Sequence, residues 1–64
     1  MLNKNQQREV ANLNQHRAIG NTASVALGLS ALIRCAMKAT QQAELIALAD
    51  QWGVANHPLF VVSL

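Results

Sequence analysis

Residues 23–39, with the sequence ASVALGLSALIRCAMKA, hold the densest run of apolar side chains in the chain. On a helix, with about 100° between successive residues, the large apolar ones fall on one broad arc, a pattern typical of a face buried in a core. The arc consists of Val25, Leu29, Leu32, Ile33 and Ala36. Because few polar residues interrupt this stretch, we expect the fold to form around one central helix over about residues 22–39.

A second stripe on the same helix contains only small side chains: Ser24, Gly28, Ala31 and Cys35. Small side chains at this spacing allow the backbone of another helix to approach closely. An interior glycine costs a helix about 1 kcal/mol relative to alanine, which indicates that the missing side chain of Gly28 is needed for packing. The stripe therefore predicts a helix contact, made either by another helix of the same chain or by a second copy.

Residues 4–19 read as a polar helix that ends at Gly20. Its narrow apolar stripe has the 4, 3, 4 spacing of a short coiled-coil seam with polar residues at both ends: Gln6, Val10, Leu13 and Arg17. Candidate N-caps precede the first two helices: Asn3 or Asn5, and Asn21 or Thr22. A break at Gly20 is the main prediction, and one continuous helix over residues 4–39 is the alternative.

A third helix is expected over residues 41–52, with Thr40 as its N-cap and Gly53 as its stop. Its core stripe is Leu45, Leu48, Ala49 and Trp52. Since Trp52 is the largest side chain in the chain, we expect it to pack in the core or to anchor an interface.

Residues 59–64, LFVVSL, have strand propensity and follow a turn around Pro58. A single strand cannot satisfy its own backbone groups, so we expect it to pair with a second copy or with the sheet edge of a partner; the alternative is a tail that frays into solvent. Alternation places Phe60, Val62 and Leu64 on the side that faces the helices. The predicted fold is thus mainly α, a small three-helix domain with a short C-terminal β-strand that pairs between chains.

The chain has 64 residues, which is enough for one small domain over residues 1–64 with a thin core. Its single cysteine, Cys35, excludes an intrachain disulfide and suggests a reduced thiol buried in a cytoplasmic protein. Association is then the remaining source of stability for such a small domain. The uncharged run over residues 18–33 is shorter than the roughly 20 residues that a membrane span needs, and residues 2–9 are too polar for a targeting segment.

Side chains that could carry chemistry are sparse and scattered. His16 and His57 lie in separate segments, no C-x-x-C or H-x-x-x-H motif is present, and the glycines lack the spacing of a phosphate-binding loop. We therefore predict no catalytic residues, no metal ligands and no cofactor, and expect the protein not to be an enzyme. The net charge of +2 is too small and too scattered to indicate nucleic acid as the main partner.

The segment Ala49-Asp50-Gln51-Trp52-Gly53-Val54 resembles the A-x-x-x-G-V half of the helix-turn-helix of bacterial and phage repressors. Leu45 and Leu48 then lie on the buried face of the first helix, and Leu59 stands where the second helix would place an apolar residue. The resemblance implies a recognition helix that begins near Asn56 and a small DNA-binding transcriptional regulator with a partial helix-turn-helix around residues 45–62.

Two functional hypotheses follow. The first is a non-enzymatic protein-binding module, a small homo-oligomeric regulator, inhibitor or adaptor of a larger protein, of the kind found among phage or plasmid accessory proteins. Its partners would be a second copy, as a homodimer, and a larger protein that the sequence does not identify. The second is the DNA-binding regulator. The residues expected to form the protein interface are Ser24, Gly28, Ala31, Cys35, Trp52, Leu59, Phe60, Val61 and Val62.

Overall fold

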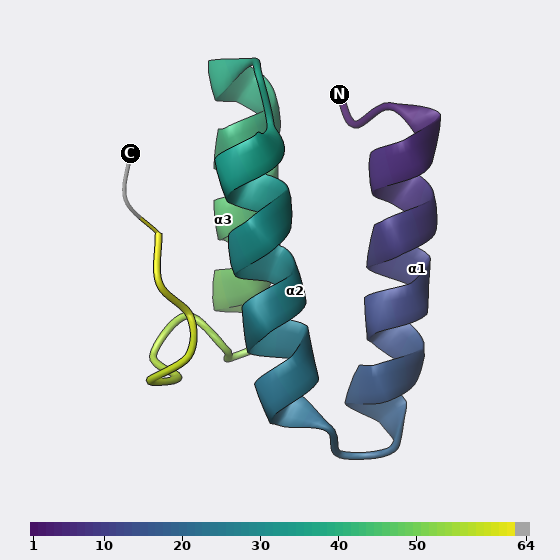
Figure 1. Ribbon diagram of the computed structural model, residues 1–64, viewed down its shortest axis with the longest axis vertical. Coiled ribbons are helices and arrows are strands. Elements are labelled where there is room, and N and C mark those ends of the chain that lie inside the picture. Colours follow the sequence, from purple (N-terminus) through teal and green to yellow (C-terminus); the bar gives the residue numbers. More distant parts are fainter. Residues whose placement is uncertain (63–64) are drawn as a thin grey trace.

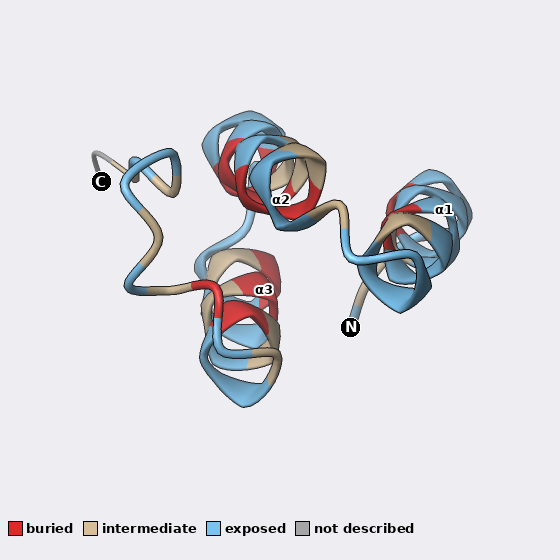
Figure 2. Ribbon diagram, turned by 90° about the horizontal axis from the view of Figure 1, so that it is seen from below, coloured by how far each residue is buried: buried red, intermediate tan, exposed pale blue. Residues whose placement is uncertain are grey.

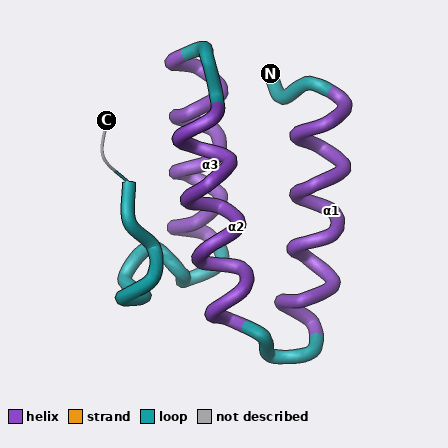
Figure 3. The backbone as a smooth tube through the Cα atoms, viewed as in Figure 1, coloured by secondary structure: helices purple, strands orange, loops and turns teal. Residues whose placement is uncertain are grey.

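The computed structural model describes residues 1–62 and contains three α-helices: α1 (Lys4–Ala18), α2 (Thr22–Cys35) and α3 (Ala39–Gln51). Helices α1 and α3 run in one direction and α2 runs in the opposite direction (Figure 1). Seen along the bundle, the three helices form a triangle whose buried residues face its centre (Figure 2). The protein is a small, mainly α domain, and no strand occurs among residues 1–62 (Figure 3).

Helix α1 begins with a capping box. The side-chain oxygen of Asn3 accepts a hydrogen bond from the backbone N–H of Gln6 at 2.8 Å, and the side-chain oxygen of Gln6 accepts one from the N–H of Asn3 at 2.8 Å. Two N–H groups that the first helical turn cannot use are thereby satisfied. Of the two predicted N-caps, Asn3 is the one that the structure uses.

The chain breaks between α1 and α2, so the prediction of a break is confirmed and the continuous helix is not formed. Gly20 has a φ of +80°, which glycine adopts readily, and its N–H donates to the Arg17 carbonyl at 3.1 Å. The N–H of Asn21 donates to the His16 carbonyl at 2.9 Å, completing a Schellman motif. Asn21 also caps α2, because its side-chain oxygen accepts from the N–H of Ser24 at 3.4 Å.

Helix α2 ends at Cys35, four residues before the predicted position. The backbone of Ala36 is extended, with a ψ of 127°, and its side chain is buried. α3 starts directly afterwards with Lys38 at the N-cap position and without a side-chain cap, so Thr40 is not the N-cap. The early end follows from packing, since the chain must reverse here for α3 to lie against α2, and this outweighs the helix propensity of Met37 and Lys38.

The end of α3 is confirmed at Gly53, whose φ is +74°. The N–H of Gly53 donates to the Asp50 carbonyl at 3.1 Å, and the N–H of Val54 donates to the Ala49 carbonyl at 3.0 Å. This is a second Schellman motif, and its usual apolar contact is present because Ala49 and Val54 are both buried in the core. The motif turns the chain back toward α2.

The core lies where the three helices meet. Its buried members are Leu13, Val25, Leu29, Ile33, Ala36, Leu45, Ala49 and Val54. Most of the predicted arc on α2 is fully buried, while Leu32 is half-buried at its edge. Ser30 is also buried in α2, at 2% exposure.

The predicted C-terminal β-strand is not formed over residues 59–62, and residues 63–64 lie outside the described part of the chain. Instead, the segment lies along α2, where the N–H of Val61 donates to Oγ of Ser30 at 3.0 Å. That hydroxyl in turn donates to the Ala26 carbonyl at 2.7 Å. The sequence argument expected the backbone groups of this segment to find their partners in another chain or in solvent. Instead, the buried hydroxyl of Ser30 accepts from the Val61 N–H within the chain, so pairing between chains is not required at this position.

The alternation of side chains along this segment is as predicted for the described residues. Phe60 and Val62 pack against the core, and Leu59 and Val61 are exposed at 41% and 59%. The segment thus closes the core on one side of α2 and turns its other side chains outward.

Candidate functional site

The stripe of small residues on α2 receives α1 of the same chain, one of the two arrangements expected from the sequence. A β-carbon built on Gly28 would lie 2.9 Å from Cδ1 of Leu13 and closer still to its Cδ2 atom. The Leu13 side chain therefore occupies the space that a larger residue at position 28 would need. Leu13 is itself buried in the core, so the missing side chain of Gly28 serves packing within the chain.

The rest of the stripe is less covered. Ser24 is half-buried, and both Ala31 and Cys35 are exposed. The expectation of a buried thiol at Cys35 is wrong, because the start of α1 presents the polar residues Asn3 and Gln6 to this end of α2 rather than an apolar side chain. The thiol consequently lines an open pocket.

Helices α1 and α3 are bridged by long side chains in a regular register. The side-chain amide of Gln6 donates to the side-chain oxygen of Gln41 at 3.2 Å, and both residues are buried. At the other end, the guanidinium carbon of Arg17 lies 5.2 Å from the centre of a Trp52 ring. Each pair is separated by 35 residues, which is the register of two parallel helices that begin 35 residues apart. We define these contacts as the α1–α3 seam.

The middle of the α1–α3 seam is apolar. The same offset of 35 residues aligns Val10 with Leu45 and Leu13 with Leu48, and all four lie in or against the core. Sequence reasoning identified the 4, 3, 4 spacing of the apolar stripe on α1. It missed that residues 41, 45, 48 and 52 of the third helical segment repeat the same spacing. Comparing the two patterns would have predicted the burial of Gln6 and Gln41.

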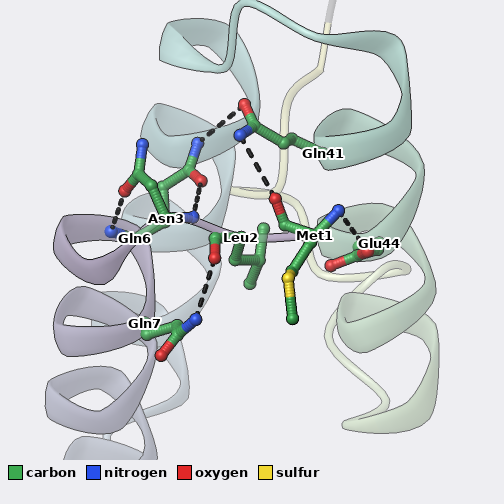
Figure 4. Close-up of polar contacts among 7 residues, drawn as sticks. All are labelled: Met1, Leu2, Asn3, Gln6, Gln7, Gln41 and Glu44. Atoms are coloured by element: carbon green, nitrogen blue, oxygen red, sulfur yellow. Dashed lines mark hydrogen bonds and ion pairs between the residues drawn. The ribbon is translucent and has the colours of Figure 1, made fainter.

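The first residues of the chain cross from α3 to α1 at one end of the seam (Figure 4). The amino group of Met1 pairs with Glu44 at 2.8 Å, and its carbonyl accepts from the Gln41 side chain at 3.3 Å. Leu2 lies between the two helices, and its carbonyl accepts from the Gln7 side chain at 2.8 Å. No Cα atom of α1 lies within 8 Å of one in α3. The crossing residues therefore fill a separation that the helices leave open.

A pocket of about 380 Å³ opens at the same end of the bundle. It is lined by Asn3, Gln6, Cys35, Met37, Lys38 and Gln41. The side chains of Asn3, Gln6 and Gln41 are already engaged with one another or with the backbone. Within residues 1–62, no buried side-chain nitrogen or oxygen lacks a hydrogen-bond partner. The side-chain amides of this pocket therefore serve to connect the helices, and none is left free for a ligand.

An apolar surface lies on the opposite side of the molecule, where the C-terminal segment meets α2. Leu27 is 52% exposed, and Ala31 follows it by one helical turn on the same helix. Leu59 and Val61 lie beside this face because the Val61 N–H binds Ser30, three residues after Leu27. We call Leu27, Ala31, Leu59 and Val61 the outer apolar surface. The only charged residue of α2, Arg34, is exposed one turn beyond it.

The remaining predicted interface residues face inward. Phe60 and Val62 pack on the core, and Trp52 is half-buried against it with Arg17 over its ring. The structure therefore brings together Ala31, Leu59 and Val61 on one surface and adds Leu27, which the sequence reading did not select. The sequence does contain a signal for Leu27. At about 100° per residue, Leu27 falls on a different side of the helix from the buried arc, so an exposed position could have been predicted.

The recognition helix implied by the helix-turn-helix resemblance is not formed, because residues 54–62 contain only turns, a bend and irregular backbone. His57 is used locally, its Nδ1 accepting from the N–H of Leu59 at 3.1 Å. His16 lies near Asn21 at the opposite side of the turn between α1 and α2. In the described part of the chain, no group of three or more His, Cys, Asp or Glu side chains is placed to hold a metal ion.

None of the helices described here is both long and apolar enough to cross a membrane. Comparisons of the chain with protein-family models, with curated proteins and with solved structures find no match.

Proposed function

We propose that this protein is a non-enzymatic protein-binding module, a small homo-oligomeric regulator, inhibitor or adaptor of a larger protein. The observation that supports this proposal is the outer apolar surface. Three of its side chains, Leu27, Leu59 and Val61, are each more than two-fifths exposed although they are large and aliphatic. They come from two segments that the Ser30 hydroxyl holds together. Exposed apolar side chains gathered on one face are typical of protein interaction sites.

The charge around this surface indicates the kind of partner that fits. Arg34 is the only charged residue on α2, whereas the three acidic residues, Glu9, Glu44 and Asp50, belong to α1 and α3. A partner with apolar side chains at its centre and a carboxylate at its rim complements this arrangement. A second copy can cover the apolar centre but brings no carboxylate from its own α2.

The test replaces one exposed apolar residue on the surface and one outside it. Leu27→Glu places a charge in the outer apolar surface, and Met37→Glu is the matched control because Met37 is 96% exposed at the turn between α2 and α3. We expect Leu27→Glu to lower the native mass in sedimentation equilibrium and to abolish capture of the partner by tagged protein, with an unchanged helical circular dichroism spectrum. Met37→Glu should behave as the wild type.

The proposal fails if both variants retain the mass and the captured partner of the wild type. It also fails if both lose them equally, because the effect would then come from charge alone. The DNA-binding alternative makes a different prediction: a sequence-specific mobility shift at physiological salt that falls with a steep log-log dependence on salt concentration.

A further inference from the structure

Helix α1 is held to the rest of the domain by few apolar contacts. Among its fifteen residues only Gln6 and Leu13 are buried, and Val10 and His16 are half-buried. The α2–α3 half, by contrast, buries a continuous set of aliphatic residues: Val25, Leu29, Ile33, Leu45, Ala49 and Val54. An element with little buried apolar surface separates from a fold at a low free-energy cost compared with global unfolding. Of the three helices, α1 therefore buries the fewest apolar side chains.

The turn that joins α1 to α2 depends on one residue. Gly20 adopts a φ of +80°, and the two neighbours Ile19 and Asn21 complete a three-residue connection between the helices. The only proline of the chain is Pro58, so nothing in residues 4–35 forbids a continuous helix. If Gly20 took helical dihedral angles, α1 and α2 would join into one helix over these residues.

We propose that α1 exchanges between two copies of the chain through this hinge, so that α1 of each copy packs against α2 of the other and is bridged to its α3 by side chains. The contacts within one chain show which residues α1 needs at this position. Leu13 fills the space beside Gly28, Gln6 binds Gln41, and Arg17 covers Trp52. Each of these contacts joins a residue before the hinge to one after it. A second copy therefore remakes all of them with the same atoms, which is the condition for domain swapping.

The register of the contacts agrees with this geometry. In an exchanged dimer each chain forms one long helix from α1 and α2, and the long helices of the two chains run antiparallel. The two-fold axis passes through the point where a residue of one chain lies against the same residue of the other. Residues 13 and 28 are equally distant from the midpoint between Gly20 and Asn21. The Leu13–Gly28 contact thus places the axis at the hinge itself, where the uncharged residues Ile19, Gly20 and Asn21 of the two chains meet.

This interface is independent of the outer apolar surface, because it uses the side of α2 that faces α1. It goes beyond the proposed function by giving self-association a defined structure. The two proposals can fail separately. Leu27 belongs to the outer apolar surface and makes no contact in the exchange of α1, so Leu27→Glu tests only the proposed function.

The decisive variant is Gly20→Ala. A β-carbon at position 20 meets no atom within 4 Å, so the substitution changes backbone preference without a steric clash. Alanine is strained at the left-handed φ of the closed turn and is favoured over glycine in a continuous helix. Both effects act in each chain of a dimer, so we expect the dissociation constant to fall on the order of a hundredfold or more in sedimentation equilibrium.

Gly53→Ala is the matched control. Gly53 has a φ of +74° and equally open surroundings, but the chain after it does not continue as a helix. This variant should lose a similar amount of stability and show the association of the wild type. Thr22→Pro supplies a reversal. At the first position of α2 proline gives up only the hydrogen bond from the Thr22 N–H to the Gly20 carbonyl, whereas inside a continuous helix it would also clash with the preceding turn. The double variant Gly20→Ala/Thr22→Pro should return to the association of the wild type.

Complementation between two chains tests for exchange directly. In the Gly20→Ala background, one chain carries Leu13→Ala and the other carries Gly28→Leu. An exchanged heterodimer contains two such contacts. In one, Leu13 lies against Gly28 as in the wild type; in the other, the small residue is at position 13 and the large one at position 28. We expect the mixture to melt at a higher temperature than either chain alone.

The proposal is overturned if Gly20→Ala associates no more strongly than Gly53→Ala. It is overturned as well if the melting curve of the mixed chains is the sum of the curves of the two separate chains. It is also overturned if Leu27→Glu dissociates the Gly20→Ala dimer, because association would then run through the outer apolar surface.

Discussion

Leu13 and Gly28 form an interlocking contact in which the leucine side chain of α1 fills the place of a side chain that α2 lacks. Since Leu13 is the only buried apolar residue of α1, this pair sets the position of α1 along α2. The polar pairs at the two ends of the α1–α3 seam then align α1 with α3. One apolar contact and two polar ones therefore place the helix.

Replacing Gly28 by leucine should destabilise the monomer by about 1–3 kcal/mol, because the added side chain would compete with Leu13 for the same space. Ala31→Leu is the control, since Ala31 belongs to the same stripe but is exposed, and its effect should stay within about 0.5 kcal/mol. Urea unfolding followed by circular dichroism measures both. Equal stabilities of the two variants would show that the space beside Gly28 is not filled.

The pair Gln6 and Gln41 should show strong coupling. Gln41→Leu removes the acceptor for the Gln6 side-chain amide in a buried site, and we expect a loss of about 1–3 kcal/mol. The double variant Gln6→Leu/Gln41→Leu should be less destabilised than the sum of the single variants, because no buried donor is left alone. A double-mutant cycle in urea gives the coupling energy, and additive effects would contradict the assigned bond.

Ser30→Ala should release the C-terminal segment. The substitution removes the acceptor of the part-buried Val61 N–H, and the loss of this hydrogen bond should cost about 0.5–1.5 kcal/mol. We expect faster hydrogen exchange and faster proteolysis after residue 54, with the helices intact. Ser24→Ala is a fitting control because Ser24 is half-buried on the same helix. Unchanged exchange at Val61 in Ser30→Ala would refute this role.

Removing the guanidinium of Arg17 from the face of Trp52 should lower the stability slightly and change the fluorescence of Trp52. Arg17→Ala should lower stability by about 0.5–1 kcal/mol, the range of exposed cation–π contacts. The fluorescence of Trp52, the only tryptophan of the chain, should change in the folded state. Arg8→Ala, an exposed arginine on the same helix, should change neither quantity. A shared response of both variants would point to net charge rather than to stacking.

The three helices could be predicted because their signals are local. Asn3, Gly20 and Gly53 mark helix ends through side-chain or backbone properties that act within a few residues. The end of α2 could not be predicted in the same way, because Met37 and Lys38 are acceptable helix residues. Only the need to bring α3 against α2 makes the chain turn at Ala36, and that need is tertiary.

The C-terminal segment shows a second limit. Its composition favours a strand, and the alternation of its side chains was read correctly, but the acceptor for its backbone is Ser30, thirty-one residues earlier in the chain. No property of residues 59–62 themselves indicates that a serine hydroxyl on α2 is available. The outer apolar surface was therefore only partly predicted, since Leu27 becomes part of it through the same contact.

The central place of α2 has a consequence for how the sequence tolerates change. α1, α3 and the C-terminal segment each lie against a different side of this helix, and each covers some of its residues (Figure 2). In a library of random substitutions, folded variants should therefore be rarest for changes at Val25, Leu29 and Ile33, which have no exposed surface. Variation should be widest at Ala23 and Arg34, which are exposed on α2.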